Sequence, residues 1–255
     1  MWKFGGLTMD NFDAMKVKND CVAWIRDWFE HNGPGCNAII GISGGKDSSV
    51  VAALCVEALG KERVLGVLLP QKYQSDIDDS YAVINHLGIE YKAINIGPIV
   101  DLTLLQLSMF GDMPITEQTK INLPPRIRMA TLYAVSQSTN GRVANTCNLS
   151  EDYIGYSTRW GDSVGDFAPL ANLTSDEVIA VGDACGLPYE LTHKTPADGL
   201  CGKTDEDNFG FTYAVLNKYI RIGICEDEEV RAKIDAMHQK NLFKLMPIPT
   251  FKYEV

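Results

Sequence analysis

The chain has 255 residues, of which 45% are hydrophobic and 22% are charged, and its formal net charge is −10 at pH 7. This composition is typical of a globular protein and argues against the disordered and fibrous classes. An acidic chain lacks the basic face that an extended nucleic-acid surface needs, so we expect no DNA or RNA partner.

Membrane and disulfide-rich classes are disfavoured in the same way. The longest apolar run, Val50 to Val56, is far shorter than the about 20 residues that cross a bilayer. The N-terminal MWKFGGLTMD lacks the apolar stretch of a targeting signal. The seven cysteines are scattered without a Cys-x-x-Cys pair, which argues against a disulfide framework and a zinc ribbon. We therefore expect a cytoplasmic protein with no membrane partner.

Helix and strand patterns alternate through the first part of the chain. An amphipathic helix is predicted at 10–31, and a buried strand at 38–42 leads through a glycine turn into a helix that is clearest from Val51 to Leu59. The next predicted elements are a strand at 64–69, a helix within 71–87 with Ser75 as N-cap, a strand at 91–96, a helix opened by Pro98, an irregular loop at 109–123, a helix at 126–137 launched by Pro124 and Pro125, and a strand at 142–146.

The order of these elements predicts the fold class. Because no tight hairpin turn joins the strands, we expect parallel pairing through right-handed crossovers. The fold class is therefore α/β, a three-layer sandwich in which a parallel sheet carries helices on both faces. Ligands of such sheets lie at the carboxyl ends of the strands.

The second part of the chain is predicted to be helical between irregular segments. These are a loop at 155–170, a helix N-capped by Thr174 that ends at Cys185-Gly186, an irregular stretch at 188–203, a helix begun at 204–207 and continued through FGFTYAVLNKYI, and a last helix at about 228–237. We expect a single domain over 1–255, with a core at about 20–225 and a C-terminal helix and tail at 226–255.

The stretch NAIIGISGGKDSSVVAALCVEALG, residues 37–60, organises the chain. Its glycine turn leaves backbone N–H groups unpaired at the start of a helix, with the positive end of the helix dipole behind them. Such a turn favours an anion, most often phosphate. The turn matches neither a Walker loop nor a GxGxxG loop. Asp47 stands before Ser48, and a carboxylate there suits a divalent metal ion.

The string SGGKDSS resembles the pyrophosphatase loop of the ATP pyrophosphatase superfamily. With it, further strings resemble the ammonia-dependent NAD synthetase family: NLPPRIRM (122–129), NTCNLSE (145–151), GYSTRWGD (155–162), GKTDEDNFG (202–210) and LFKLMPIPTF (242–251). The resemblance covers the chain from about residue 20 to 251. It implies an adenine nucleotide alpha hydrolase-like fold without a glutaminase domain.

The resemblance also implies an activity. A member of this family is a ligase that binds ATP, Mg²⁺ and deamido-NAD, the nicotinate form of the dinucleotide. The nicotinate carboxylate attacks the α-phosphate, which gives an acyl-adenylate and pyrophosphate. Ammonia then displaces AMP and leaves the carboxamide of NAD. The resemblance further implies a homodimer.

The site residues follow from the resemblance, position by position. Catalytic roles fall on Asp47, Glu151 and Asp162, and Asp47 and Glu151 would hold magnesium. ATP binding is expected of Gly41, Ile42, Ser43, Gly44, Gly45, Lys46, Asp47, Ser48 and Thr146. Deamido-NAD binding is expected of Arg126, Arg159, Asp166 and Lys244. Asp162 and Asp166 match loop positions near the nicotinate ring, where an acidic group can hold ammonium and accept its proton.

The chain departs from the family pattern at three positions. Arg159 replaces a common lysine and keeps the charge. Ser175 stands where many relatives have an ATP-binding lysine, and Ala197 where a hydroxyl residue is common, so neither is placed in the site. Lys194 and Lys203 are candidates to compensate for the missing charge.

Two other interpretations share the same glycine turn. One is a different adenylating enzyme, such as a tRNA thiolation or GMP-forming enzyme, although the chain offers neither clear catalytic cysteines nor a basic RNA surface. The other is a sensor that binds ATP without turning it over. The presence of both Asp47 and Glu151 argues against a sensor, because binding alone does not require a metal pair.

Overall fold

The computed structural model describes residues 12–194 and 205–253. Its centre is a four-stranded sheet in the order β3-β2-β1-β4. The strands are β1 (Asn37–Gly41), β2 (Val64–Leu68), β3 (Glu90–Ala93) and β4 (Gly141–Val143). All pairs are parallel, with Ala38 opposite Val64 and Arg142, and Leu65 opposite Glu90. The predicted parallel sheet is therefore confirmed.

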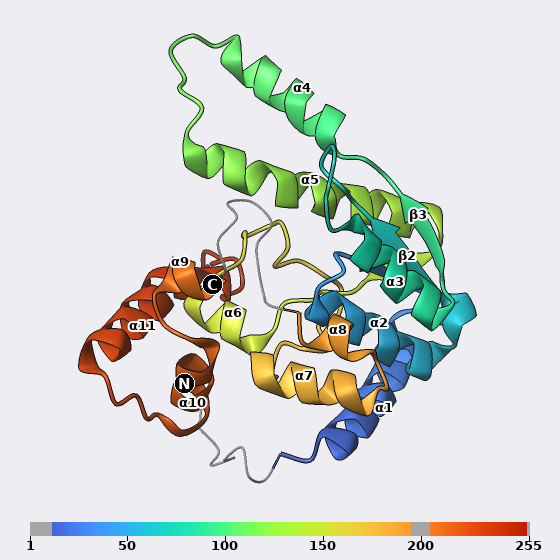
Figure 1. Ribbon diagram of the computed structural model, residues 1–255. Helices are drawn as coiled ribbons and strands as arrows, with labels where there is room; N and C mark the ends of the chain where they lie inside the picture. Colours follow the sequence, from blue (N-terminus) through green and yellow to red (C-terminus); the bar gives the residue numbers. More distant parts are fainter. Residues whose placement is uncertain (1–11, 195–204, 254–255) are drawn as a thin grey trace.

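Helices cover both faces of the sheet (Figure 1). One face packs against α1 (Ala14–Asn32), α2 (Lys46–Leu59), α3 (Ile77–Leu87), α7 (Ser175–Ala184) and α8 (Tyr189–Thr192), and the other against α4 (Gly97–Ser108) and α5 (Glu117–Ser138). The alternation of side chains in β1 explains the two layers: Ala38 and Ile40 enter the first core, whereas Ile39 enters the second. The predicted three-layer α/β sandwich is confirmed.

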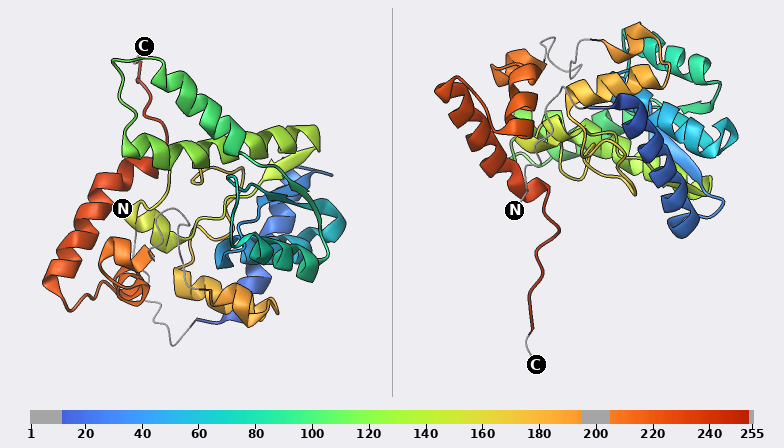
Figure 2. Two further views of the ribbon diagram at one scale, coloured as in Figure 1. Left: turned by 45° about the horizontal axis from the view of Figure 1, so that its top comes forward. Right: turned by 90° about the horizontal axis from the view of Figure 1, so that it is seen from below.

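A second group of helices lies beside the sandwich, at the left in Figure 1. It consists of α6 (Leu149–Ile154), α9 (Asp205–Phe209), α10 (Tyr213–Ile222), α11 (Glu228–Asn241) and the short helix η3 (Leu242–Lys244). These helices share their own apolar core, which includes Ile154, Phe209, Leu216 and Ile234. Beyond η3 the chain runs away from the body (Figure 2). None of the helices formed by the described residues is long and apolar enough to cross a membrane.

Several predicted boundaries are wrong. Helix α5 begins at Glu117, so the end of the predicted loop is helical and Pro124 and Pro125 lie inside the helix. Thr116 explains the early start, because its side chain accepts a hydrogen bond from Thr119 N and caps the helix. The N-cap of α3 is Asp76 rather than Ser75.

The predicted helix after residue 204 is two helices. Gly210 separates α9 from α10 with a φ of +76°, a left-handed conformation that ends a helix. Thr212 then caps α10 by accepting a hydrogen bond from Val215 N. A further difference is in α2, which begins at Lys46, so that Lys46, Asp47 and Ser48 form its first turn. Ala197 and Lys203 lie outside the described residues.

The glycine turn before α2 is fixed by close packing against α3. Gly44 has a φ of +79°, and a Cβ there would lie 2.7 Å from both the Asp79 Cβ and the Ser80 N. We predict that Gly44→Ala lowers the free energy of unfolding by about 2–4 kcal/mol, since the clash adds to the backbone strain. Urea unfolding measures this loss.

The matched control is Gly186→Ala. Gly186 has a similar φ of +74°, but a Cβ there would have no heavy atom within 4 Å. Backbone strain alone should lower its stability by about 1 kcal/mol. Equal losses in the two variants would contradict the close approach at Gly44.

Candidate active site

The glycine turn joins the end of β1 to the start of α2. Ile42 is buried and donates its N–H to Val67 O at 3.0 Å, which ties the turn to β2. Ser43 Oγ lies 3.2 Å from Ser48 Oγ and accepts a hydrogen bond from Gly45 N at 3.2 Å. Gly45, the N-cap of α2, has no side chain to cap the helix. The first N–H groups of α2 therefore face the end of the sheet where an anion is favoured.

The structure brings Asp47 and Glu151 together through one asparagine. Asp47 Oδ1 accepts a hydrogen bond of 2.9 Å from Asn148 Nδ2. Asn148 is the N-cap of α6, and its backbone N–H donates to Glu151 Oε2 at 3.4 Å. Two carboxylates from separate helices thus contact the same residue.

The donor set at this point fits magnesium. Mg²⁺ is usually held by one or two carboxylates together with substrate phosphates and water. Asp47 and Glu151 supply the two carboxylates beside the phosphate-favouring turn. The described part of the chain contains no group of three or more His, Cys, Asp or Glu side chains that could hold a metal ion without such a substrate. Phosphate oxygens would therefore have to complete the coordination.

Further acidic groups surround the buried thiol of Cys147. Burial and the nearby carboxylates of Glu151, Asp152 and Asp162 raise the pKa of this thiol well above its ordinary value. Cys147 Sγ also donates to Asp162 O at 3.4 Å. The thiol stays protonated and is not a nucleophile.

Asp162 and Asp152 are the two carboxylates whose protonation the site alters. Asp162 Oδ1 accepts a 2.8 Å hydrogen bond from Thr158 N, which opposes the effect of burial, yet burial still raises the pKa of Asp162. Burial, together with the charge of Asp162, raises the pKa of Asp152 to about 6. The two acids lie close enough to repel each other.

A pocket of about 420 Å³ lies between α5, the 155–162 loop and the end of α11. Its lining residues include four cations and two aromatic rings: Arg126, Arg159, Lys240, Lys244, Trp160 and Phe243. The guanidinium of Arg159 lies 4.9 Å from the Trp160 ring and 5.1 Å from the Phe243 ring. Arg126 Nε donates to Arg159 O at 3.3 Å. Cations with aromatic faces suit a nucleotide that carries phosphates.

Lys244 links this pocket to the acidic group. Its Nζ donates to Gly155 O at 2.7 Å and to Ser157 O at 2.9 Å. Burial lowers the pKa of Lys244, whereas the charge of Asp162 acts in the opposite direction. The cationic pocket and the carboxylates are therefore neighbouring parts of one site.

Not every predicted site residue lies in this pocket. Asp166 contacts residues of its own surroundings, since its Oδ1 accepts from Tyr133 OH at 3.1 Å and its Oδ2 from Val143 N at 2.8 Å. It does not line the pocket that contains Arg126, Arg159 and Lys244. Thr146 is half-buried just beyond β4.

The structure also shows the surroundings of Ser175, which departs from the family pattern, and of Lys194, a candidate to compensate for the missing charge. Ser175 is buried at the start of α7, where its N–H donates to Ser150 Oγ at 3.0 Å. Lys194 Nζ lies 2.5 Å from Asp79 Oδ2 and 3.3 Å from Asp76 Oδ2, at the start of α3. Lys194 thus carries a positive charge beside the helix that packs against Gly44.

Sequence reasoning missed several residues of the site. Asn148 was detectable, because Asn followed three residues later by Glu is the signature of a helix capping box. Lys240, Trp160 and Phe243 carried no such signal, since only the folded chain brings α11 and η3 to the pocket. Asp152 gains its raised pKa from burial, which sequence alone does not give.

A phosphate-favouring turn and an acidic pair at the carboxyl ends of parallel strands define a phosphate-binding α/β protein. The comparisons with known proteins are more specific. The model of the NAD synthase family matches residues 17–255, and this chain belongs to that family. The family predicted from the sequence is confirmed, and the predicted class of enzyme, a ligase, agrees with it.

Relatives cover nearly the whole chain. An NH₃-dependent NAD⁺ synthetase from Thermococcus sibiricus is 38% identical over 248 residues, which are 96% of this chain and 92% of the relative. The solved structure of NMN synthetase from Francisella tularensis has a TM-score of 0.87 and 30% identity and covers 95% of this chain and 100% of its own. The solved structure of NH₃-dependent NAD synthetase from Campylobacter jejuni has a TM-score of 0.76 and 28% identity and covers 94% of this chain and 100% of its own.

The raised pKa of Asp152 predicts a pH-dependent stability. Below about pH 4 the carboxyl is protonated in both the folded and the unfolded chain, so it has no effect. As the pH rises toward 6 the unfolded chain ionises first, because the folded pKa is about 6. The carboxyl therefore destabilises the metal-free fold, and the penalty is fully present above pH 6.

Asp152→Asn removes this penalty. We predict that it raises the free energy of unfolding at pH 8 by about 1–2 kcal/mol, allowing for water near a half-buried side chain. The gain should vanish at pH 4. Urea unfolding in EDTA at both pH values measures it, and the same gain at pH 4 and pH 8 would show that Asp152 acts through packing instead.

Proposed function

We propose that this chain is an ammonia-dependent NAD synthetase that joins ammonia to the nicotinate carboxylate of deamido-NAD at the expense of ATP. The supporting observation is that Asn148 contacts both Asp47 and Glu151 beside the glycine turn. Cleavage of ATP into AMP and pyrophosphate needs an anion site and a divalent ion at one place, and these three residues and the turn provide for both.

The glycine turn binds the pyrophosphate part of ATP. The N–H groups of the first turn of α2 and the hydroxyls of Ser43 and Ser48 are donors for its oxygens. Asp47 and Glu151 would hold Mg²⁺, and the bound ion would neutralise charge on the leaving pyrophosphate. We also assign ATP binding to Thr146, which follows β4, the strand beside β1. Positioning and charge neutralisation account for most of such a step.

The cationic pocket binds the nicotinate substrate. Arg126, Arg159 and Lys244 face its phosphates, and Lys240 adds a fourth positive charge. The rings of Trp160 and Phe243, which already contact the guanidinium of Arg159, provide apolar surface for a base or a ribose. Lys244 is held by the carbonyls of Gly155 and Ser157, so its ammonium group has a fixed direction.

Asp162 receives the ammonia. Its carboxylate is held by Thr158 N and lies near Lys244, at the junction of the pocket and the acidic group. A carboxylate there attracts ammonium and accepts a proton from it, which frees the nitrogen lone pair for attack on the adenylated carboxyl. Because its pKa is raised, Asp162 is a stronger base than a carboxylate with an ordinary pKa. Asp166 supports the same loop through Val143 and Tyr133.

One observation supports nicotinate mononucleotide as a second candidate substrate. The NMN synthetase of Francisella tularensis matches this chain with a TM-score of 0.87, against 0.76 for the NAD synthetase of Campylobacter jejuni. The second candidate function is therefore the same amidation on nicotinate mononucleotide, which lacks the adenylate half of deamido-NAD. The glycine turn, the metal ligands and Asp162 would serve both reactions.

One assay tests the reaction and separates the two substrates. The protein is mixed with ATP, Mg²⁺ and ammonium, and with either deamido-NAD or nicotinate mononucleotide. We expect AMP and pyrophosphate in amounts equal to the amide product, and a higher kcat/KM for deamido-NAD. A higher kcat/KM for the mononucleotide favours the second candidate. ADP as product, or no turnover with either substrate, contradicts both.

The role of Asp47 is tested in the same assay. Asp47→Asn keeps the shape of the side chain but removes its negative charge, so we expect AMP formation to fall at least about a thousandfold. Circular dichroism and thermal unfolding check that the variant is folded. Turnover close to that of the unchanged protein would mean that Asp47 does not hold the metal ion.

We also propose a homodimer in which a second copy covers the outer face of α4. This helix and the segment after it stand away from the body in Figure 1. Both carry exposed apolar side chains. They are Ile99, Leu102, Leu105, Met109, Phe110 and Met113, each at least 45% exposed. A patch of this kind on a globular protein marks an interaction site.

The dimer is tested by charging this face. Leu105 is 58% exposed, and we predict that Leu105→Lys converts the dimer to a monomer in sedimentation experiments at micromolar concentration. Met15→Lys, at a similarly exposed apolar residue on α1, is the control and should leave the mass unchanged. A monomeric unchanged protein would contradict the proposal.

A further inference from the structure

Both carboxylate oxygens of Asp47 are already occupied. Oδ1 accepts from Asn148 Nδ2 at 2.9 Å, and Oδ2 lies 2.9 Å from the ammonium group of Lys46. The Lys46 side chain is only 3% exposed and that of Asp47 18%, so water screens their attraction weakly. A divalent ion that binds Asp47 through Oδ2 would therefore lie beside the ammonium group, and the repulsion between the two cations favours displacement of the ammonium group.

Lys46 is well placed to move to a different anion. It is the first residue of α2, in the same turn whose N–H groups favour a phosphate. Its Nζ also lies 5.8 Å from the centroid of the Tyr213 ring, whose face attracts a cation. The ammonium group is thus held between the metal ligand, an aromatic ring of α10 and the anion site.

We propose that Lys46 is the counter-ion of Asp47 in the free enzyme and that it passes from this carboxylate to the ATP phosphates when the divalent ion binds. The proposal deepens the proposed function, on which it rests. It assigns to Lys46 the coupling of metal binding to nucleotide binding.

The coupling follows from charge. A divalent ion bound alone would lie beside a buried ammonium group, and like charges repel strongly where water is scarce. A nucleotide bound alone would draw the ammonium group away and leave the Asp47 carboxylate facing phosphates. When both bind, the carboxylate pairs with the metal ion and the ammonium group with phosphate. The Lys46–Asp47 pair is then broken once for two ligands, so each ligand strengthens the binding of the other.

Binding measurements on Lys46→Gln test this coupling. The Kd of Mn²⁺ is measured by electron paramagnetic resonance, without nucleotide and with saturating α,β-methylene ATP. Without nucleotide, we expect Lys46→Gln to bind Mn²⁺ about tenfold more tightly than the unchanged protein, a change equivalent to about 1.4 kcal/mol. The factor by which the nucleotide strengthens Mn²⁺ binding should fall by a similar amount.

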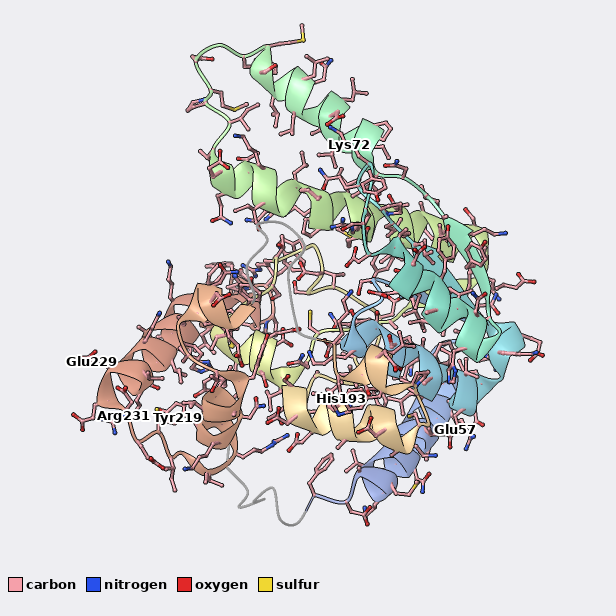
Figure 3. All side chains as sticks on the ribbon, viewed as in Figure 1. Glu57, Lys72, His193, Tyr219, Glu229 and Arg231 are labelled. Carbon is pink, nitrogen blue, oxygen red and sulfur yellow. The ribbon has the colours of Figure 1, made fainter. Side chains whose placement is uncertain are left out.

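Lys18→Gln is a matched control. Lys18 is also a buried lysine paired with a carboxylate of α2, because its Nζ lies 2.7 Å from Glu57 Oε1 and its side chain is 11% exposed. Glu57 lies near the C-terminal end of that helix, away from the glycine turn (Figure 3). This variant should bind Mn²⁺ like the unchanged protein, with and without nucleotide.

Two results overturn the proposal. One is a folded Lys46→Gln protein that binds Mn²⁺ no more tightly than the unchanged protein, or that keeps the full coupling. If this variant does not fold, a crystal structure of the unchanged protein with Mn²⁺ and α,β-methylene ATP decides. Lys46 Nζ should then contact a phosphate oxygen and lie more than about 4 Å from Asp47, and an ammonium group still on Asp47 is the second contrary result.

The failure of this inference is distinguishable from that of the proposed function. The readouts are metal affinity and geometry, neither of which depends on turnover. If the enzyme forms AMP and the amide product but Lys46 has no effect on metal binding, only the inference about Lys46 is wrong. If the enzyme forms no amide product, the proposed function is wrong, whatever the effect of Lys46 on metal binding.

Discussion

The site depends on the hydrogen bonds of one buried amide, that of Asn148. Its Nδ2 donates to Asp47 at the start of α2, while its Oδ1 accepts from Ser150 N and Glu151 N at the start of α6. Asp47 lies 101 residues earlier in the chain, so this amide joins the sandwich to the second group of helices. An aspartate at this position would face Asp47 with a second negative charge, whereas an amide can donate to one carboxylate through its nitrogen while its oxygen caps the helix.

The sheet and its two helical layers were predictable because the signal is local. In β1 the apolar side chains point alternately to two cores, and the glycine turn follows at once. The start of α5 and the break before α10 were not predictable in this way. Two prolines suggested a helix start, but the helix begins at the Thr116 cap and continues through Pro124 and Pro125 because α5 packs along the sheet. The residues around Gly210 have a composition typical of a helix. The composition therefore does not reveal that Gly210 adopts a left-handed conformation, which ends α9.

The site was predictable where a motif fixes neighbours in sequence and not where only the fold brings residues together. Asp47 and Glu151 belong to recognisable sequence motifs, and in the structure both accept a hydrogen bond from Asn148. Asp166 belongs to an equally recognisable loop, yet both its oxygens serve Tyr133 and Val143. Which partners a side chain contacts depends on its neighbours in space, which the motif does not contain.

The distribution of charge in the site favours one orientation of the substrate. The chain has a net charge of −10, yet Arg126, Arg159, Lys240 and Lys244 line one pocket. The charges of Lys244 and Asp162 interact, so this cationic pocket adjoins the carboxylates around Cys147. A substrate with phosphates at one end and a carboxyl to be amidated at the other can satisfy both regions only in one orientation. In the proposed reaction, that orientation would place the reacting carboxyl beside Asp162, the residue to which we assign the ammonium, and would keep the phosphates away from it.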